Sequence, residues 1–268
     1  MAFEKNVLGQ YIPADSYIHK LDPRVKILLA IAAMAAVFST HSLYGFGLWC
    51  CAAFAVAWLS KIPFSSVLRS VKPVAVLVVF TSLLHLFLTP GRALITVGPI
   101  SITNEGIITA AAMALRLILL VIFAALLTLT TTPAKISDGL ERLLSPFAKL
   151  GLPAHETAMM ITIALRFIPT LFEETSRIIN AQKSRGADFE SGGLLKRAKA
   201  YVPVLIPLFV IIFKRAENLA VAMEARGYCG GAGRTRMYPL EWKKTDTAAV
   251  LAFVAAAAAI LTLDRLLS

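Results

Sequence analysis

Charge is scarce in this sequence, and acidic charge most of all. Only 16% of the 268 residues are charged, with 16 Asp and Glu against 27 Lys and Arg, which gives a net charge of +11. Hydrophobic residues make up 57% of the chain, whereas a soluble domain has about 45–50%. This excess predicts a membrane-embedded protein. It also argues against nucleic-acid binding, the other common reading of a basic composition.

The groups that carry catalysis are sparse as well. The four histidines are scattered singly, and no HExxH, GxSxG or Gly-rich loop ending in Gly-Lys-Ser/Thr occurs. The three cysteines show neither a disulfide framework nor a metal-ligand spacing. Glu173 and Glu174 are adjacent carboxylates, but we interpret Glu173 as the i,i+4 partner of Arg177 on a solvated helix face. We therefore expect no enzyme activity and no cofactor bound by this chain.

Long apolar runs are what the sequence does have. They cover residues 25–38, 43–59, 74–88, 107–129 and 248–263. They predict an all-α integral membrane protein with about five transmembrane helices, although the first run is short against the roughly 20 residues that a span needs. We expect polar loops or turns over 60–73 and 90–104.

The first apolar run follows the sequence Leu-Asp-Pro-Arg-Val-Lys. Asp22 is a suitable helix N-cap, and Pro23 suits the first helical turn. We expect Arg24 and Lys26 to lie at the lipid headgroups. Residues 1–26 have no apolar stretch after their charges, which predicts a cytoplasmic lead-in in place of a cleaved signal.

The stretch between the fourth and fifth runs is different, because charges interrupt its apolar residues every few positions. We expect a short amphipathic helix within 136–153 and two long helices over 155–185 and 194–226, with prolines inside both long helices. The predicted organisation is therefore 1–130, a lead-in with four spans; 131–245, a cytoplasmic region; and 246–268, the final span. We call residues 131–245 the middle region.

The distribution of basic residues supports five spans with the N-terminus inside and the C-terminus outside. The outer loops and tail carry only Arg92 and Arg265, whereas residues 131–244 carry 17 Lys or Arg. This is the asymmetry of the positive-inside rule. Two further spans at 156–172 and 201–213 would still place the two termini on opposite sides of the membrane, but they would leave Arg166 in lipid.

Arg116 is the one basic residue inside a predicted span, about 15 Å deep in the fourth. A charge at this depth faces a bundle interior or a cavity with a partner. No carboxylate lies inside any of the five runs. Its partners are then backbone carbonyls, hydroxyls or another subunit, and both a structural contact and a functional intramembrane contact stay open.

Two charged motifs end the two long helices of the middle region. Ala181 to Gly186 reads AQKSRG and Ala222 to Gly227 reads AMEARG, 41 residues apart. A cation followed by glycine is a common helix C-cap, so each motif alone is explained by capping. The motif occurs twice, in a sequence with no visible motif for binding or hydrolysing a nucleotide. This predicts two arginine tips that fit acidic pockets on a dimer of related subunits.

With LDPRVK, NAQKSRGADF and KRAENLAVAMEARGY, the chain resembles the transmembrane T-component of energy-coupling factor (ECF) vitamin and metal transporters over essentially its whole length. The surroundings of both motifs resemble the shared type that serves several S-components. The resemblance implies docking of two ABC-type ATPases through Ser184-Arg185-Gly186 and Ala225-Arg226-Gly227, where Ser184 replaces the usual Ala. It also implies one membrane-embedded S-component that captures the substrate.

The resemblance further implies a non-catalytic subunit of the bacterial cell membrane, which transmits ATP-driven motion to the S-component for uptake of vitamins or other micronutrients. A self-contained secondary transporter is the main alternative. Such proteins show paired repeats and charged or broken helices at the membrane midplane, and this sequence fits that pattern poorly. A membrane enzyme would need a cluster of titratable groups, which the sequence does not show.

Overall fold

The computed structural model describes residues 11–97, 100–144, 146, 154–191, 193–230 and 241–267. Internal contacts divide them into two compact units. The membrane unit contains 11–143 and 241–267, and the crossed-helix unit contains 144–230. Residues 1–10 and the C-terminal part of the amphipathic helix predicted within 136–153 lie outside the described residues.

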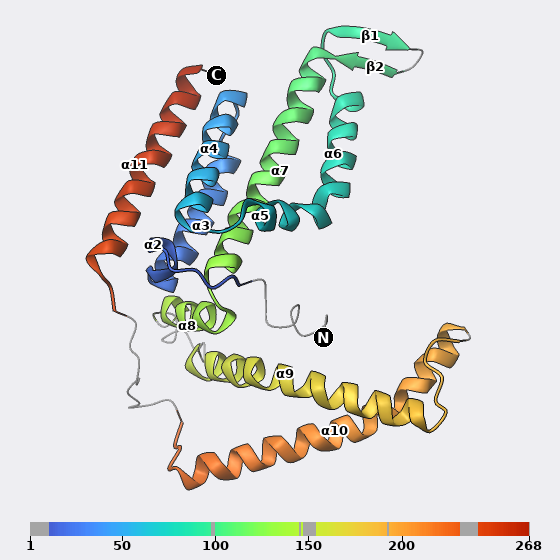
Figure 1. Cartoon of the computed structure of the whole chain (residues 1–268). Coiled ribbons are helices and arrows are strands. Elements are labelled where there is room, and N and C mark those ends of the chain that lie inside the picture. The colour runs from blue at the N-terminus through green and yellow to red at the C-terminus, as the bar shows by residue number, and fades with distance from the viewer. Residues whose placement is uncertain are drawn as a thin grey trace. The chain divides into compact units, whose positions relative to one another are not determined.

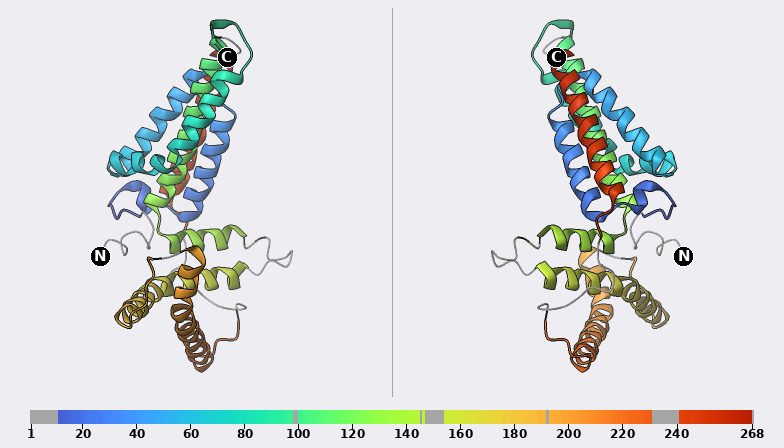
Figure 2. Two further views of the ribbon diagram at one scale, coloured as in Figure 1. Left: turned by 90° about the vertical axis from the view of Figure 1, so that its right-hand side faces the viewer. Right: turned by 90° about the vertical axis from the view of Figure 1, so that its left-hand side faces the viewer.

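The membrane unit consists of helices joined by short connections (Figure 1). Its elements are α2 (Tyr17–Lys20), α3 (Pro23–Phe38), α4 (Leu43–Leu59), α5 (Phe64–Val71), the 3₁₀ turn η1 (Lys72–Val74), α6 (Ala75–Leu88), β1 (Ala93–Val97), β2 (Ile100–Thr103), α7 (Asn104–Thr130), α8 (Pro133–Leu144) and α11 (Lys244–Leu267). All but the two short strands are helical, which confirms the all-α class. Helices α3, α4, α7 and α11 lie side by side, and α6 packs along α7 (Figure 2).

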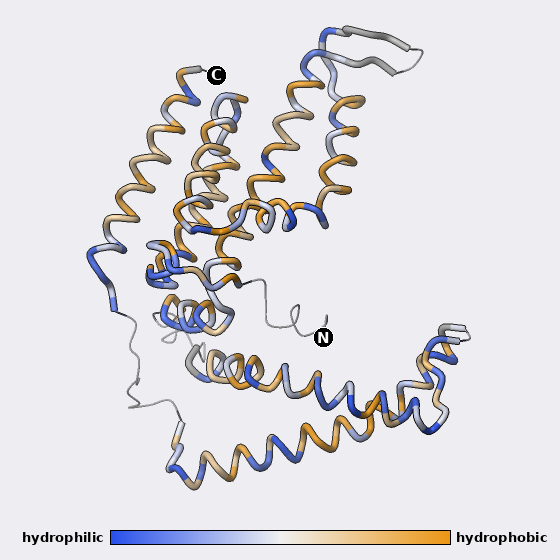
Figure 3. The backbone as a smooth tube through the Cα atoms, viewed as in Figure 1, coloured by the Kyte–Doolittle hydropathy of each residue, from blue (hydrophilic) through white to orange (hydrophobic). Residues whose placement is uncertain are grey.

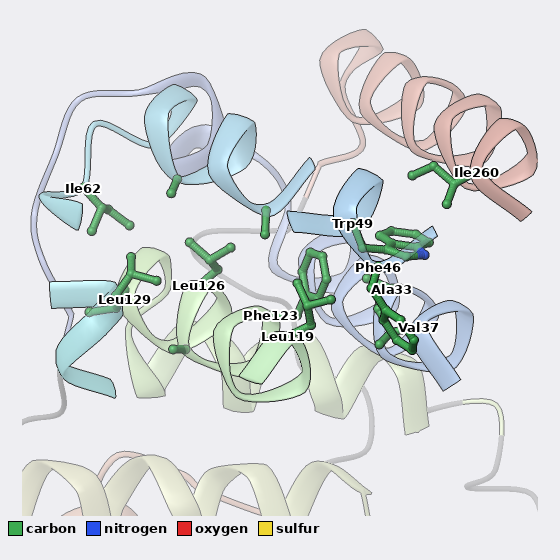
Figure 4. Packing of buried hydrophobic residues seen from close by; sticks show 14 residues of the cluster. Ala33, Val37, Phe46, Trp49, Ile62, Leu119, Phe123, Leu126, Leu129 and Ile260 are labelled. Carbon is green, nitrogen blue, oxygen red and sulfur yellow. The ribbon is translucent and has the colours of Figure 1, made fainter. Parts of the chain in front are cut away.

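The core of the membrane unit is built around Trp49 of α4 (Figure 4). Its ring meets the edge of Phe123 of α7 at a centroid distance of 5.9 Å, and its indole N–H donates to the Thr40 hydroxyl at 3.1 Å. Small residues of α4, Ala53 and Ala57, are buried beside it. Close approach through small side chains is how helices pack when lipid removes the hydrophobic drive between them.

Among the described residues, three helical stretches are long and apolar enough to cross a membrane: 64–88, 104–130 and 244–266. Helix α4, with 17 residues, is a shorter apolar helix, and α3 has 16. At 1.5 Å per residue, each of these two is about 25 Å long, below the roughly 30 Å of bilayer hydrocarbon. Every predicted apolar run therefore forms a helix, while the count of five spans stays a prediction.

The structure corrects three expectations. The segment 60–73 is no loop: it contains α5, because its apolar residues fall at helical spacing and Val67 is buried. The segment 90–104 contains the antiparallel hairpin β1–β2, because both arms are rich in β-branched residues, which favour strands. Lys26, which was expected at the lipid headgroups, is buried within the protein and only 6% exposed. Asp22 is the N-cap of α3, and Pro23 opens that helix, as predicted.

The crossed-helix unit contains α9 (Ala154–Ser184) and α10 (Leu194–Ala225). Both continue through internal prolines, Pro169 in α9 and Pro203 with Pro207 in α10, which confirms the two predicted long helices. The two helices cross each other (Figure 1). Polar and apolar residues alternate along both, unlike the more continuously apolar helices of the membrane unit (Figure 3). Neither is among the three stretches suited to span a membrane.

Candidate functional site

The first Arg-Gly motif forms the C-terminal end of α9. Arg185 follows the last helical residue, and Gly186 comes next with φ of +88°. The amide of Gly186 donates to the Lys183 carbonyl at 3.0 Å, and the amide of Ala187 donates to the Gln182 carbonyl at 2.9 Å. This pair of bonds is the Schellman motif, whose C′ residue takes a left-handed conformation that glycine adopts without steric penalty.

The second motif ends α10 in the same way. Arg226 is the C-cap, and Gly227 has φ of +71°. The amide of Gly227 donates to the Glu224 carbonyl at 2.8 Å, and the amide of Tyr228 donates to the Met223 carbonyl at 3.0 Å. The two ends therefore have one backbone geometry, with an arginine at the C-cap and a glycine at C′ in each.

Both arginine side chains are exposed, as are their neighbours Ser184 and Ala225. Within the described ranges, neither Arg185 nor Arg226 uses its guanidinium in a hydrogen bond or an ion pair. A guanidinium presents five donors in a planar fork and stays charged when buried. Each tip is therefore a free cationic head on a rigid helix, suited to bind a carboxylate-lined pocket.

An ion pair joins the two helices where they cross. The Arg215 guanidinium of α10 donates to the Glu174 carboxylate of α9 at 3.1 Å and to the Thr170 hydroxyl at 3.0 Å. The sequence analysis placed the ion pair of this stretch between Glu173 and Arg177, within one helix. That interpretation was wrong: among the described residues, Glu174 makes the pair, and it makes it between helices, because α10 packs on that face.

The ion pair lies at the same sequence distance from both tips. Glu174 precedes Arg185 by eleven residues, and Arg215 precedes Arg226 by eleven. Each tip is therefore about 16 Å along its helix from the residue that forms the ion pair. Figure 1 shows the two C-terminal ends on opposite sides of the crossing.

Local hydrogen bonds hold the turn that follows the first tip. Asp188 accepts hydrogen bonds from the amides of Glu190 and Ser191 at 2.9 and 3.0 Å. A hydrogen bond from the Ser191 hydroxyl, together with these two amide bonds, lowers the pKa of the Asp188 carboxyl to about 2. Phe189 is buried against the Tyr201 ring, with centroids 5.0 Å apart. This turn leads the chain from the first tip directly into α10.

Arg116 lies in α7 and bonds within the membrane unit. Its guanidinium donates to the Thr40 carbonyl at 2.7 Å and sits 5.4 Å from the Phe46 ring centroid. It also contacts the Met113 sulfur at 3.6 Å. The partner is therefore a backbone carbonyl, one of the partners expected from the sequence. The Nε atom is buried without a hydrogen-bond partner among the described residues.

The turn between α3 and α4 is held from a second side by a residue that the sequence analysis missed. Asp264 of α11, 3% exposed, accepts hydrogen bonds from the amides of His41 and Ser42 at 3.0 and 2.9 Å. Arg116 and Asp264 thus bind successive residues of one turn. The signal was present in the sequence, since a carboxylate at the end of an apolar helix requires donors.

No group of three or more His, Cys, Asp or Glu residues that could hold a metal ion occurs in the described part of the chain. The three cysteines are free. The candidate functional residues are therefore arginines and the groups that position them: the two tips, the ion pair at the crossing, and Arg116.

Comparison with known proteins identifies the family. The family model described as cobalt transport protein, CbiQ, matches residues 14–238. The chain is 53% identical over 262 residues to a protein of Thermanaerovibrio acidaminovorans named energy-coupling factor transporter transmembrane protein EcfT, covering 98% of this chain and 97% of the relative. It is 50% identical over 248 residues to the protein of that name from Acidaminococcus fermentans, covering 92% of each chain.

The protein of that name from Bacillus subtilis is 44% identical over 253 residues, which cover 94% of this chain and 96% of the relative. All three alignments run through both Arg-Gly motifs, since each covers more than nine tenths of the chain and the family match ends only at residue 238. The chain therefore belongs to the CbiQ family, as a transmembrane T-component of the energy-coupling factor transporters.

Proposed function

We propose that this chain is the coupling subunit of an ECF-type ABC importer. Its two arginine tips dock two ABC-type ATPase subunits, and its membrane helices bind one S-component that captures a vitamin or another micronutrient. Closure of the ATPases on ATP moves α9 and α10, and this movement reorients the S-component. The chain itself binds no nucleotide and no cofactor.

The observation that carries this proposal is the matched pair of free tips. Two exposed arginines have the same cap geometry, and each follows its helix's residue of the ion pair by eleven positions. Two similar cationic tips suit two similar acidic pockets, which a dimer of related subunits provides. Capping alone accounts for each glycine, but it gives no reason for two arginines to remain without partners in the described chain.

The same proposal places the protein in the bacterial cell membrane as a multi-pass subunit, with its N-terminus in the cytoplasm and its C-terminus outside. The basic middle region supports this orientation through the positive-inside rule. The shared subtype, which serves several S-components, is part of the proposal and rests on the resemblance of the motif surroundings.

Charge reversal at the tips tests the docking. We expect Arg185→Glu and Arg226→Glu each to weaken assembly with the ATPases, and the double variant to abolish it, because loss of one buried interfacial charge costs about 2–5 kcal/mol. Arg177→Glu is the matched control, since Arg177 is exposed on α9 away from the tip. The measurement is the amount of ATPase recovered with a tagged chain, normalised to its expression. Full ATPase recovery with the double variant would refute the docking role.

A further inference from the structure

The middle region begins directly after α7 and ends in the first turn of α11, and both of these junctions lie in the membrane unit and meet the same short segment. That segment is Asp22 to Lys26, the start of α3, which we call the DPRVK segment. All of its contacts described below lie within the membrane unit.

The first contact is at the outgoing junction. The Lys26 ammonium donates to the carbonyl of Thr130, the last residue of α7, at 3.2 Å, and to the His19 carbonyl at 3.1 Å. A helix leaves its last carbonyls without partners and carries partial negative charge there. A buried cation therefore caps the end of α7 at the point where the middle region begins.

The second contact is at the returning junction. Asp246, 1% exposed, lies in the first turn of α11 and accepts a hydrogen bond from the Lys243 amide at 2.8 Å, as in a capping box. Its other oxygen accepts a hydrogen bond from the Asp22 amide at 2.8 Å. One carboxylate thus starts α11 and ties it to the start of α3.

The segment itself is held rigidly. Arg24 binds the Asp22 carboxylate with two nitrogens, the shorter bond being 2.8 Å, and Asp22 caps the Arg24 amide at 2.9 Å. Helix α8 also packs against it: a Cβ added to Gly139 would be 3.1 Å from Pro23 and 3.3 Å from the Arg24 amide nitrogen. Only glycine permits so close an approach without displacement of a neighbour.

We propose that the DPRVK segment is the fixed base of the middle region. It holds both ends of that region, after α7 and at the start of α11. Movement of α9 and α10 is then transmitted to the membrane helices and is not lost through local motion at either end. Lys26 and Asp246 are the positioning residues. This inference rests on the proposed coupling function, because a base matters for coupling only if the middle region is driven by partners.

The test separates assembly from coupling. Lys26→Met and Asp246→Ala, singly and together, are compared in vesicles carrying the complete complex, supplied with tritiated riboflavin, biotin and thiamine. We expect ATPase recovery and ATP hydrolysis to stay at the wild-type level, while uptake per ATP hydrolysed falls about tenfold, the effect of leaving a buried group without its partner. Uptake per ATP hydrolysed in the double variant is no lower than in the worse single variant, because loss of either contact already frees one end of the middle region.

Lys135→Met is the matched control, since Lys135 is an exposed lysine on nearby α8 and its loss changes the net charge equally. Lys26→Arg, which keeps the donors, should restore most of the uptake. Wild-type uptake per ATP in both single variants would overturn the inference. Failure of the wild-type chain to recover any ATPase would instead overturn the proposed function.

A second measurement needs no variant and so does not depend on folding of a substituted chain. Hydrogen exchange of peptides covering 19–26 and 243–250 is followed in the wild-type complex with and without ATP. A fixed base predicts the same slow exchange in both states. Faster exchange of either peptide on ATP binding would show that the junction opens during the cycle and would overturn the inference.

Discussion

A glycine with positive φ follows each of the two crossed helices, α9 and α10, and this conformation is strained for residues with a side chain. A residue with a side chain in the left-handed region costs about 1–2 kcal/mol. Gly186 and Gly227 both lie in open space, so their substitution to Ala meets no clash and tests the backbone alone. At these two positions, the role of glycine is to terminate the helix and leave the arginine as its last side chain.

We expect Gly186→Ala and Gly227→Ala to weaken ATPase recovery by about tenfold each, because the tip then samples other conformations before it docks. Gly47→Ala is the control, since Gly47 is also in open space but lies within a helix, where Ala is favoured. Recovery equal to the wild type in both tip variants would show that the cap geometry does not matter for docking.

Arg116 is a second case in which one residue carries a structural task. Its donation to the Thr40 carbonyl satisfies an acceptor on a fully buried residue. We expect Arg116→Leu to lower the free energy of unfolding by about 1–3 kcal/mol, since the carbonyl loses its donor. Thermal unfolding in detergent measures this. Arg92→Leu makes the same change at an exposed site and should leave the melting temperature unchanged; an equally unchanged value for Arg116→Leu would mean that the bond adds no stability.

Among the elements, the crossing of α9 and α10 determines how the two tips are placed. The ion pair there is partly exposed, with Arg215 at 32% and Glu174 at 26% side-chain exposure. Its contribution is therefore modest, about 1 kcal/mol after solvent screening. It joins the two helices at positions that each precede the tip arginine by eleven residues.

We expect Glu174→Arg and Arg215→Glu each to reduce ATPase recovery a fewfold, and the exchanged double variant to restore it, because only the double variant recreates the pair. The double-mutant cycle measures the coupling between the two positions. Glu173→Arg, the same change at the exposed neighbouring residue, should have little effect. A double variant worse than both single variants would argue against a specific pair.

Periodicity and charge predicted the helices well but the contacts between them poorly. The five apolar runs and the two long helices follow from composition and length, and the caps at Asp22 and Gly227 follow from local backbone chemistry. The partners of Glu174 and Lys26 depend on which helix packs against which, and that information lies in residues over forty and over one hundred positions away. Helix α5 was missed because its polar residues masked a regular apolar spacing.

At the scale of the whole molecule, the charge asymmetry predicts its orientation. Basic residues concentrate in segments that five spans would place inside. In a variant with Cys50, Cys51 and Cys229 replaced by Ala, we expect Arg92→Cys to react with a membrane-impermeant thiol reagent in intact cells. Lys72 is exposed and lies in a segment that the topology places inside, so Lys72→Cys should react only after permeabilisation. The reverse labelling pattern would contradict the predicted topology.

The central claim is that this chain acts by binding partner subunits. The most direct test is native mass spectrometry of the tagged chain purified from the membranes of its own cells. The account predicts a complex of one such chain with two ABC-type ATPase subunits and one small membrane-embedded S-component. A chain recovered alone, or with copies of itself only, would contradict it.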